Sequence, residues 1–155
     1  MVKLKYSLFL LIPLFFSACS SLVLEPADFA WPVESVLKAD EKGNVQERQY
    51  NVSFNTMKLF LEETGDSLSY AGRDLRLIRD SKGFYFITSD NFKNVYVFNA
   101  DNGTLRLENK IAISDTLGMK DPAFNQRPPY IELVYGTKKI NLKHDGIAEK
   151  EEEKQ

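Results

Sequence analysis

The sequence has few of the residues that build small catalytic and metal centres, since its 155 residues include one cysteine and one histidine. With His144 as the sole imidazole, we expect neither a nucleophile triad nor a zinc centre of several His and Cys ligands. A histidine followed by Asp145-Gly146 is typical of an exposed turn. The single cysteine also excludes an internal disulfide, so packing must stabilise the fold. We therefore predict no catalytic residue and no metal site.

Long apolar runs and clusters of basic residues are also missing. The most apolar stretch, residues 8–16, falls well short of the about 20 residues that a membrane-spanning helix requires. Lysines and arginines are scattered apart from Lys138-Lys139, and the net charge is −2. Proteins that bind nucleic acid carry basic stripes, so nucleic acid is not an expected partner.

The first residues have the order of a bacterial export signal, in which lysines precede an apolar stretch and small residues precede the cleavage site. The segment Phe16-Ser17-Ala18-Cys19 resembles the lipobox of a bacterial lipoprotein precursor, with Phe16 at the position where such signals most often carry Leu. The resemblance implies cleavage between Ala18 and Cys19, a diacylglycerol thioether on Cys19, and acylation of its new amino group. This covalent lipid is the only cofactor that the sequence implies.

The residues that follow Cys19 bear on where the protein is delivered. Lipoproteins with an Asp there tend to stay at the inner membrane, whereas this chain has Ser20 and Ser21. The resemblance therefore implies a lipid-anchored protein on a periplasmic or other extracytoplasmic face, at the outer membrane if the host has one. The alternatives are an ordinary secretory signal ending at Ala18, which leaves a soluble protein with a free thiol, and an uncleaved anchor.

Four segments follow from this interpretation. We predict a signal peptide, helical in the precursor, over residues 1–18, a lipidated cysteine and spacer over 19–30, a single β domain over 31–144, and a mobile tail over 145–155. Cleavage leaves 137 residues, a length suited to one domain. It removes two of 20 basic residues and none of 22 acidic ones, so the mature net charge is −4. The tail carries charges without an apolar face to bury.

Alternating apolar and polar residues, divided by turn residues, predict an all-β fold. Asp101-Asn102-Gly103 supplies the left-handed positions of a tight hairpin over residues 98–108, and Gly136-Thr137 closes a second hairpin. We expect a small antiparallel sandwich or barrel of about eight strands with a largely aromatic core. The expected strands are residues 33–38, 45–54, 75–78, 84–88, 95–98, 105–108, 130–135 and 139–142.

Two local features are less regular than this pattern. Residues 33–38 and 45–54 are separated by the turn-forming residues 40–44, which predicts that they pair as a hairpin. Residues 55–64 suit a helix, because apolar side chains recur at helical spacing before Gly65, yet residues 58–62 also suit a strand. We favour the strand.

The connection of residues 114–129 is long enough to be functional. Its apolar, planar and rigid groups are of the kind that interfaces favour, which makes it a possible binding loop with Met119, Phe124, Arg127 and Tyr130 as contact residues. The alternative is that Phe124 and Tyr130 close one end of the core while Pro128-Pro129 stiffens the entry to the next strand.

The sequence thus predicts a lipid-anchored protein of the cell envelope that acts as a non-enzymatic binding or accessory module. Its partner would be an envelope protein complex or a wall polymer, with the membrane contacted through the lipid. The alternative is a small envelope hydrolase that uses two carboxylates from Glu62, Glu63, Asp115 and Asp121. A carboxylate pair in one cleft would favour the enzyme, and an exposed apolar patch without such a cleft would favour binding.

Overall fold

The computed structural model of the chain describes residues 34–101 and 104–148. The predicted signal peptide, Cys19, the spacer and residues 149–155 of the predicted tail lie outside the described residues. The described chain forms eleven strands and one helix: β1 (Ser35–Lys38), β2 (Asn44–Glu47), β3 (Val52–Asn55), α1 (Met57–Thr64), β4 (Asp74–Arg79), β5 (Tyr85–Ser89), β6 (Asn94–Asp101), β7 (Thr104–Ala112), β8 (Ala123–Arg127), β9 (Tyr130–Tyr135), β10 (Lys138–Lys143) and β11 (Gly146–Ile147).

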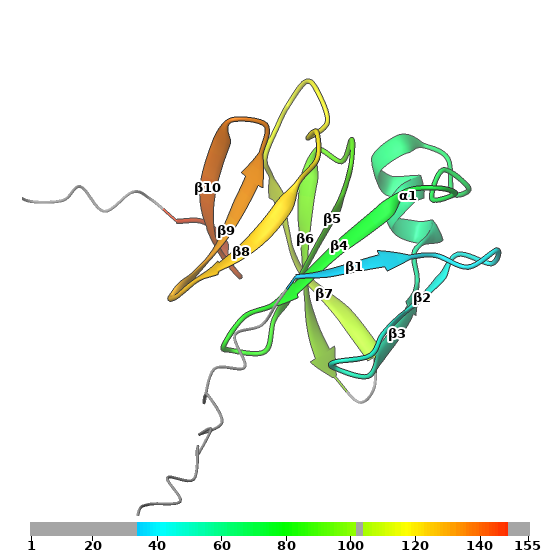
Figure 1. Cartoon of the computed structure of the whole chain (residues 1–155), viewed down its shortest axis with the longest axis horizontal. Helices are drawn as coiled ribbons and strands as arrows, with labels where there is room; N and C mark the ends of the chain where they lie inside the picture. The colour runs from blue at the N-terminus through cyan, green and yellow to red at the C-terminus, as the bar shows by residue number, and fades with distance from the viewer. Residues whose placement is uncertain (1–33, 102–103, 149–155) are drawn as a thin grey trace, which may run out of the picture.

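The strands form three antiparallel sheets (Figure 1). One sheet has the order β1-β4-β5-β6-β7, a second has the order β11-β10-β9-β8, and β2 pairs only with β3. The prediction of an antiparallel all-β domain is confirmed. Each of the two larger sheets has an edge strand on either side, so the described strands do not form a closed barrel.

The two larger sheets share one hydrophobic core. The first sheet contributes Leu77, Phe86 and Ile87, and the second contributes Leu133 and Leu142, all with no exposed surface. Strand β8 contacts β4, and β11 contacts β7, so the sheets meet near their edges. Burying a side chain of this size stabilises a fold by about 1.5–3 kcal/mol. This cluster therefore contributes much of the stability of the domain.

The predicted strand at residues 55–64 is wrong, because residues 57–64 form α1 and only Asn55 belongs to a strand. Leu59 and Phe60 are buried, and Gly65 ends the helix in a left-handed conformation, with its N–H donating to the Leu61 carbonyl at 2.9 Å. The Phe60 ring packs edge-on against Tyr70 and Phe92, with centroid distances of 6.3 and 5.0 Å. These long-range aromatic contacts decide between two local patterns that the sequence leaves balanced. The helix has eight residues, and the described chain contains no helix long and apolar enough to cross a membrane.

The predicted pairing of residues 33–38 with residues 45–54 is also wrong. Strand β1 pairs with β4, with Ser35 opposite Leu77, and residues 45–54 fold back on themselves as β2 and β3. The buried Glu47 carboxylate accepts the backbone N–H groups of Gln49 and Tyr50 at 3.1 and 2.6 Å, which stabilises the tight turn between these strands.

Two strands lie in segments that the sequence assigned to a loop and to the tail. Strand β8 occupies part of the predicted loop 114–129, because Phe124 enters the core while its neighbours pair with β9. The predicted tail boundary at residue 145 falls inside a hairpin, because Ile147 of β11 pairs with Leu142 and the Ala148 N–H donates to the Asn141 carbonyl.

The hairpin of β9 and β10 runs between two ends of the domain, which we call the entry end and the distal end. At the entry end lie the start of β9, the end of β10 and the β4–β5 turn at residues 80–83. The first described residue, Glu34, also lies near this end, because the next residue, Ser35, pairs with Leu77 three residues before that turn. At the distal end lie the β9–β10 turn, Asn91 and the loop of residues 113–122.

A candidate binding groove at the entry end

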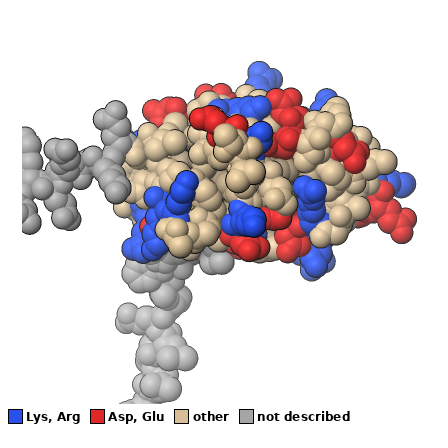
Figure 2. Space-filling view, turned by 90° about the horizontal axis from the view of Figure 1, so that it is seen from above, with Lys and Arg blue, Asp and Glu red and all other residues tan. Residues whose placement is uncertain are grey.

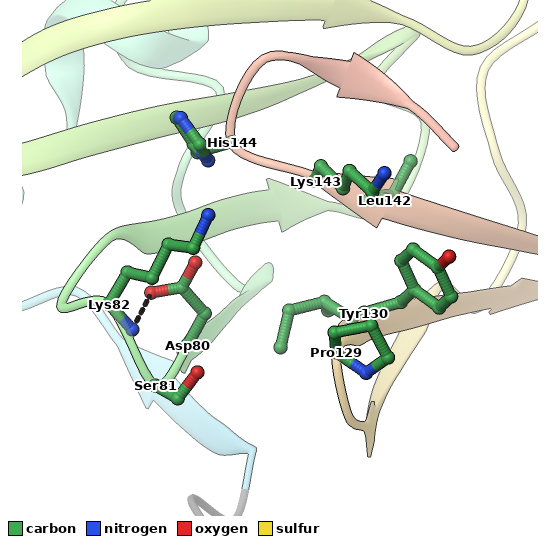
Figure 3. A pocket seen from close by; sticks show the side chains of 9 residues that line it. Asp80, Ser81, Lys82, Pro129, Tyr130, Leu142, Lys143 and His144 are labelled. Carbon is green, nitrogen blue, oxygen red and sulfur yellow. Dashed lines mark hydrogen bonds between the residues drawn. The ribbon is translucent and has the colours of Figure 1, made fainter. Parts of the chain in front are cut away.

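A groove of about 360 Å³ opens at the entry end of the β9–β10 hairpin (Figure 3). The β4–β5 turn forms it together with the start of β9 and the end of β10, which lie far from that turn in the sequence. It is lined by Asp80, Ser81, Lys82, Pro129, Tyr130, Ile131, Leu142, Lys143 and His144. The walls therefore combine two lysines, a histidine and a tyrosine with apolar surface.

One wall of the groove is the β4–β5 turn, which Asp80 organises. Its Oδ1 atom accepts the backbone N–H groups of Lys82 and Phe84 at 2.9 and 2.8 Å, and its carbonyl accepts the Gly83 N–H at 3.2 Å. Gly83 has a φ of +97°, which glycine tolerates better than other residues. The Asp80 carboxylate thus serves the turn, and the turn places Lys82 on the rim.

The opposite wall is formed by neighbouring residues of β9 and β10. Ile131 pairs with Leu142, so Tyr130 and Lys143 are adjacent across the two strands. The Lys143 Nζ atom lies 5.2 Å from the centre of the Tyr130 ring, within the range of a cation–π interaction. The ring therefore holds a positive charge beside the groove without neutralising it.

His144 lies at the end of β10 and is held by aromatic stacking. Its ring stacks on Phe84 with a centroid distance of 4.4 Å and an interplanar angle of 7°. Its carbonyl accepts the Asn109 side-chain amide at 3.3 Å. His144 lies in the turn between β10 and β11, as predicted, but its side chain is half-buried instead of exposed, and Figure 3 shows the Lys82 amine extending toward its ring.

The four residues predicted to form a binding loop do not lie together. Met119 and Phe124 are 1% and 3% exposed and belong to the core, as the alternative interpretation held for Phe124. Arg127 is exposed at the end of β8, with its Nε atom 3.6 Å from the Glu132 carboxylate. Of the four residues, only Tyr130 lines the entry-end groove. Strand β8 lies between Met119 and Tyr130 in the sequence and carries Tyr130 to the other end of the hairpin.

The carboxylates nominated for hydrolysis lie away from the groove. Glu62 is hydrogen-bonded to Lys110 at 2.8 Å, and this hydrogen bond together with the positive charge of Lys110 lowers the Glu62 pKa. Asp115 and Asp121 lie on the distal loop, and Asp121 has a φ of +46°. Among the residues that line the groove, Asp80 is the one carboxylate.

The fourth nominated carboxylate, Glu63, joins α1 to the start of β6. It accepts the Lys93 N–H at 2.8 Å, the Asn94 amide at 2.6 Å and the Tyr96 hydroxyl at 2.8 Å. Burial of Tyr96, together with this hydrogen bond, raises the Tyr96 pKa well above its usual range. All of these contacts are within the fold. In the described part of the chain, no group of three or more His, Cys, Asp or Glu side chains is placed to hold a metal ion.

Sequence reasoning missed the groove because its walls come from segments about 50 residues apart. Residues 80–83 lie between two predicted strands, and residues 139–142 were predicted as a strand, but nothing local indicated that these segments meet. The only usable signal was the adjacency of Lys143 and His144 at the end of a predicted strand. The chain matches no family model, no curated protein and no solved structure. The geometry of the groove is therefore the basis for proposing a function.

Proposed function

We propose that the protein is a lipid-anchored, non-enzymatic binding module of the cell envelope and that the entry-end groove recognises an acidic saccharide of the wall. In this proposal the two larger sheets act as the layers of a β-sandwich that carries the groove. The observation that supports it most is that Lys82, Lys143 and His144 line one groove and that the Lys143 amine lies over the ring of Tyr130 in its wall.

The wall of the groove suits a sugar that bears a carboxylate or a phosphate. An aromatic face such as that of Tyr130 packs against an apolar sugar face, and two ammonium groups attract an anionic substituent. Elsewhere on the surface, Figure 2 shows Lys and Arg side chains intermixed with Asp and Glu over the face in view. In this proposal the anionic saccharide is recognised by the lysines of the groove and not by a large positively charged surface.

The lipid would act by raising the local concentration of the domain. Cys19 and Glu34 are separated by 15 residue steps in the sequence, a length of chain that extends at most about 50 Å. A groove at the entry end would therefore stay close to the membrane surface and to the wall polymer beside it. Such tethering makes a modest interface sufficient, because the ligand is met at a high effective concentration. Delivery to an outer membrane, where the host has one, is part of this proposal.

A saccharide titration tests the groove. The soluble Cys19→Ala chain would be titrated by calorimetry with tetragalacturonate and with its methyl ester, which has the same sugar backbone and no charge. We expect the acid to bind more tightly, and a Lys82→Gln/Lys143→Gln variant to lose about tenfold in affinity. The matched control is Lys58→Gln, an exposed lysine on α1, which should bind as the parent does. Equal affinity for the acid and its ester, or equal loss in the control, would contradict the proposed site.

A further inference from the structure

A second groove, also of about 360 Å³, lies at the distal end of the same hairpin. It is bounded by the loop of residues 113–122 and by the β9–β10 turn. Leu117 stands at its edge and is 78% exposed, more than any other large hydrophobic side chain among the described residues. The entry-end groove shares no lining residue with it.

Two backbone hydrogen bonds to residues 91 and 92, and one buried side chain, hold the loop that carries Leu117. The Asn91 N–H donates to the Met119 carbonyl at 2.7 Å, and the Met119 N–H donates to the Phe92 carbonyl at 2.8 Å. The Met119 side chain is 1% exposed and packs in the core. A leucine two residues from such an anchor is presented on a rigid support.

Gly118 joins the exposed leucine to the buried methionine and tightens the loop further. A Cβ atom at this position would lie 2.1 Å from the Asn91 carbonyl oxygen, so only glycine allows this approach. The conformation that turns Leu117 outward is therefore built into the fold before any partner binds. A preorganised side chain loses little conformational freedom on binding, which favours affinity.

The charge inside the groove indicates the partner. The groove is lined by Lys120 and Lys138 and by no carboxylate, whereas Asp115 and Asp121 lie on the same loop outside the lining. The Lys138 Nζ atom lies 5.7 Å from the centre of the Tyr135 ring, which holds this cation at the groove. The nearby Asp90 carboxylate is engaged by the Asp121 N–H at 3.1 Å and by the Asn91 amide at 2.7 Å.

We propose that this distal surface, formed by Leu117, Lys120, Tyr135 and Lys138, docks an acidic protein segment that carries an apolar side chain. The apolar part would pack beside Leu117 and Tyr135, and the acidic residues would pair with the two lysines. A membrane surface is the alternative occupant, which vesicle binding distinguishes from a protein segment. The inference depends on neither the lipid nor the saccharide groove.

Fluorescence anisotropy with a labelled peptide of sequence Asp-Glu-Leu-Phe-Glu-Asp tests this surface on the soluble Cys19→Ala chain. Two further peptides serve as probes, one with Lys in place of every acid and one with Ser in place of Leu-Phe. We expect the acidic apolar peptide to bind best. Lys120→Gln and Lys138→Gln should each weaken it by roughly threefold, and Leu117→Ser should weaken it at least as much.

Matched controls make the result decisive. Leu68→Ser changes another exposed leucine, 60% exposed, and Lys82→Gln changes a lysine of the entry-end groove. Both variants should bind the peptide as the parent does. The proposal is overturned if the basic peptide binds equally well, if Leu117→Ser has no effect, or if no peptide binds. It is also overturned if the chain binds vesicles of phosphatidylglycerol through Leu117 and ignores the peptide.

Discussion

The entry end and the distal end of the β9–β10 hairpin carry grooves of similar volume that are built in different ways. At the entry end, the groove depends on a turn capped by Asp80, and its charged and imidazole side chains, Lys82, Lys143 and His144, are polar and partly exposed. At the distal end, a loop is held by the buried Met119 and presents the exposed Leu117. One strand pair thus supports two surfaces whose chemistry differs.

Stability and recognition are coupled at the distal end and separate at the entry end. Side chains that line the entry-end groove, such as Lys82 and Lys143, lie at the ends of strands and outside the core, so changing them should alter binding without unfolding the domain. At the distal end, the display of Leu117 depends on a residue that is also part of the core. Damage to the core should therefore remove distal docking first.

The largest expected effect is at the distal anchor. Met119→Ala removes a fully buried side chain and should lower the free energy of unfolding by about 2–5 kcal/mol, because it leaves a cavity under the loop. Urea denaturation followed by circular dichroism measures this loss. The control Lys120→Ala, at an exposed neighbour, should change stability by less than about 0.5 kcal/mol. Similar losses in both variants would show that the loop is not held by its core residue.

The next effect concerns the helix that braces the distal end. Glu63→Ala leaves the Lys93 N–H, the Asn94 amide and the Tyr96 hydroxyl without their acceptor, which should cost about 1–3 kcal/mol of stability. The same substitution at the exposed neighbour Glu62, which contacts Lys110, should cost much less. Equal values from urea denaturation of the two variants would refute the bracing role of Glu63.

At the entry end we expect a smaller change in stability and a larger change in binding. Asp80→Ala removes the acceptor of two turn N–H groups, a loss of about 1 kcal/mol, because water can replace part of each hydrogen bond. Saccharide affinity should fall because Lys82 is no longer fixed, while the acidic peptide should bind at the distal end unchanged. Calorimetry and anisotropy on one variant separate the two ends. A parallel loss of both activities would mean that they are not independent.

The most gradual effect is on the pH dependence of stability. Burial and the hydrogen bond to Glu63 raise the Tyr96 pKa, so the folded chain keeps this proton where an unfolded tyrosine, with a pKa of about 10, would lose it. The contribution is complete below pH 10 and declines as the pH rises above it. Urea midpoints between about pH 8 and pH 11 should fall less steeply for Tyr96→Phe than for the parent. Identical slopes would contradict this assignment.

Local patterns were enough to predict the strands whose neighbours in sequence are also their neighbours in space. The meander of β4, β5 and β6 and the hairpins of β6–β7 and β9–β10 all have short connections, and the register of β6 with β7 agrees with a two-residue connection after Asp101. In such pairs the turn chemistry and the alternation of side chains specify the same structure.

Local patterns did not predict the elements whose structure depends on contacts between residues far apart in the sequence. The helix at residues 57–64 depends on the packing of Phe60 against Phe92, and the partner of β1 depends on β4. Strand β8 has one core side chain, Phe124, in a polar stretch, so its alternation is too weak to notice. The two grooves could not be predicted for the same reason, because each is formed by segments that no local sequence pattern connects.

The most direct test of the lipid anchor is the intact mass and membrane partitioning of the protein expressed in a bacterial host, beside its Cys19→Ala variant. We expect a wild-type chain that begins at Cys19, carries the mass of its acyl chains and sediments with membranes, and a variant that carries no acyl chains and does not sediment with membranes. A soluble wild-type chain with an unmodified thiol would contradict the lipid anchor. It would also leave the two grooves as sites of a protein that is free in solution.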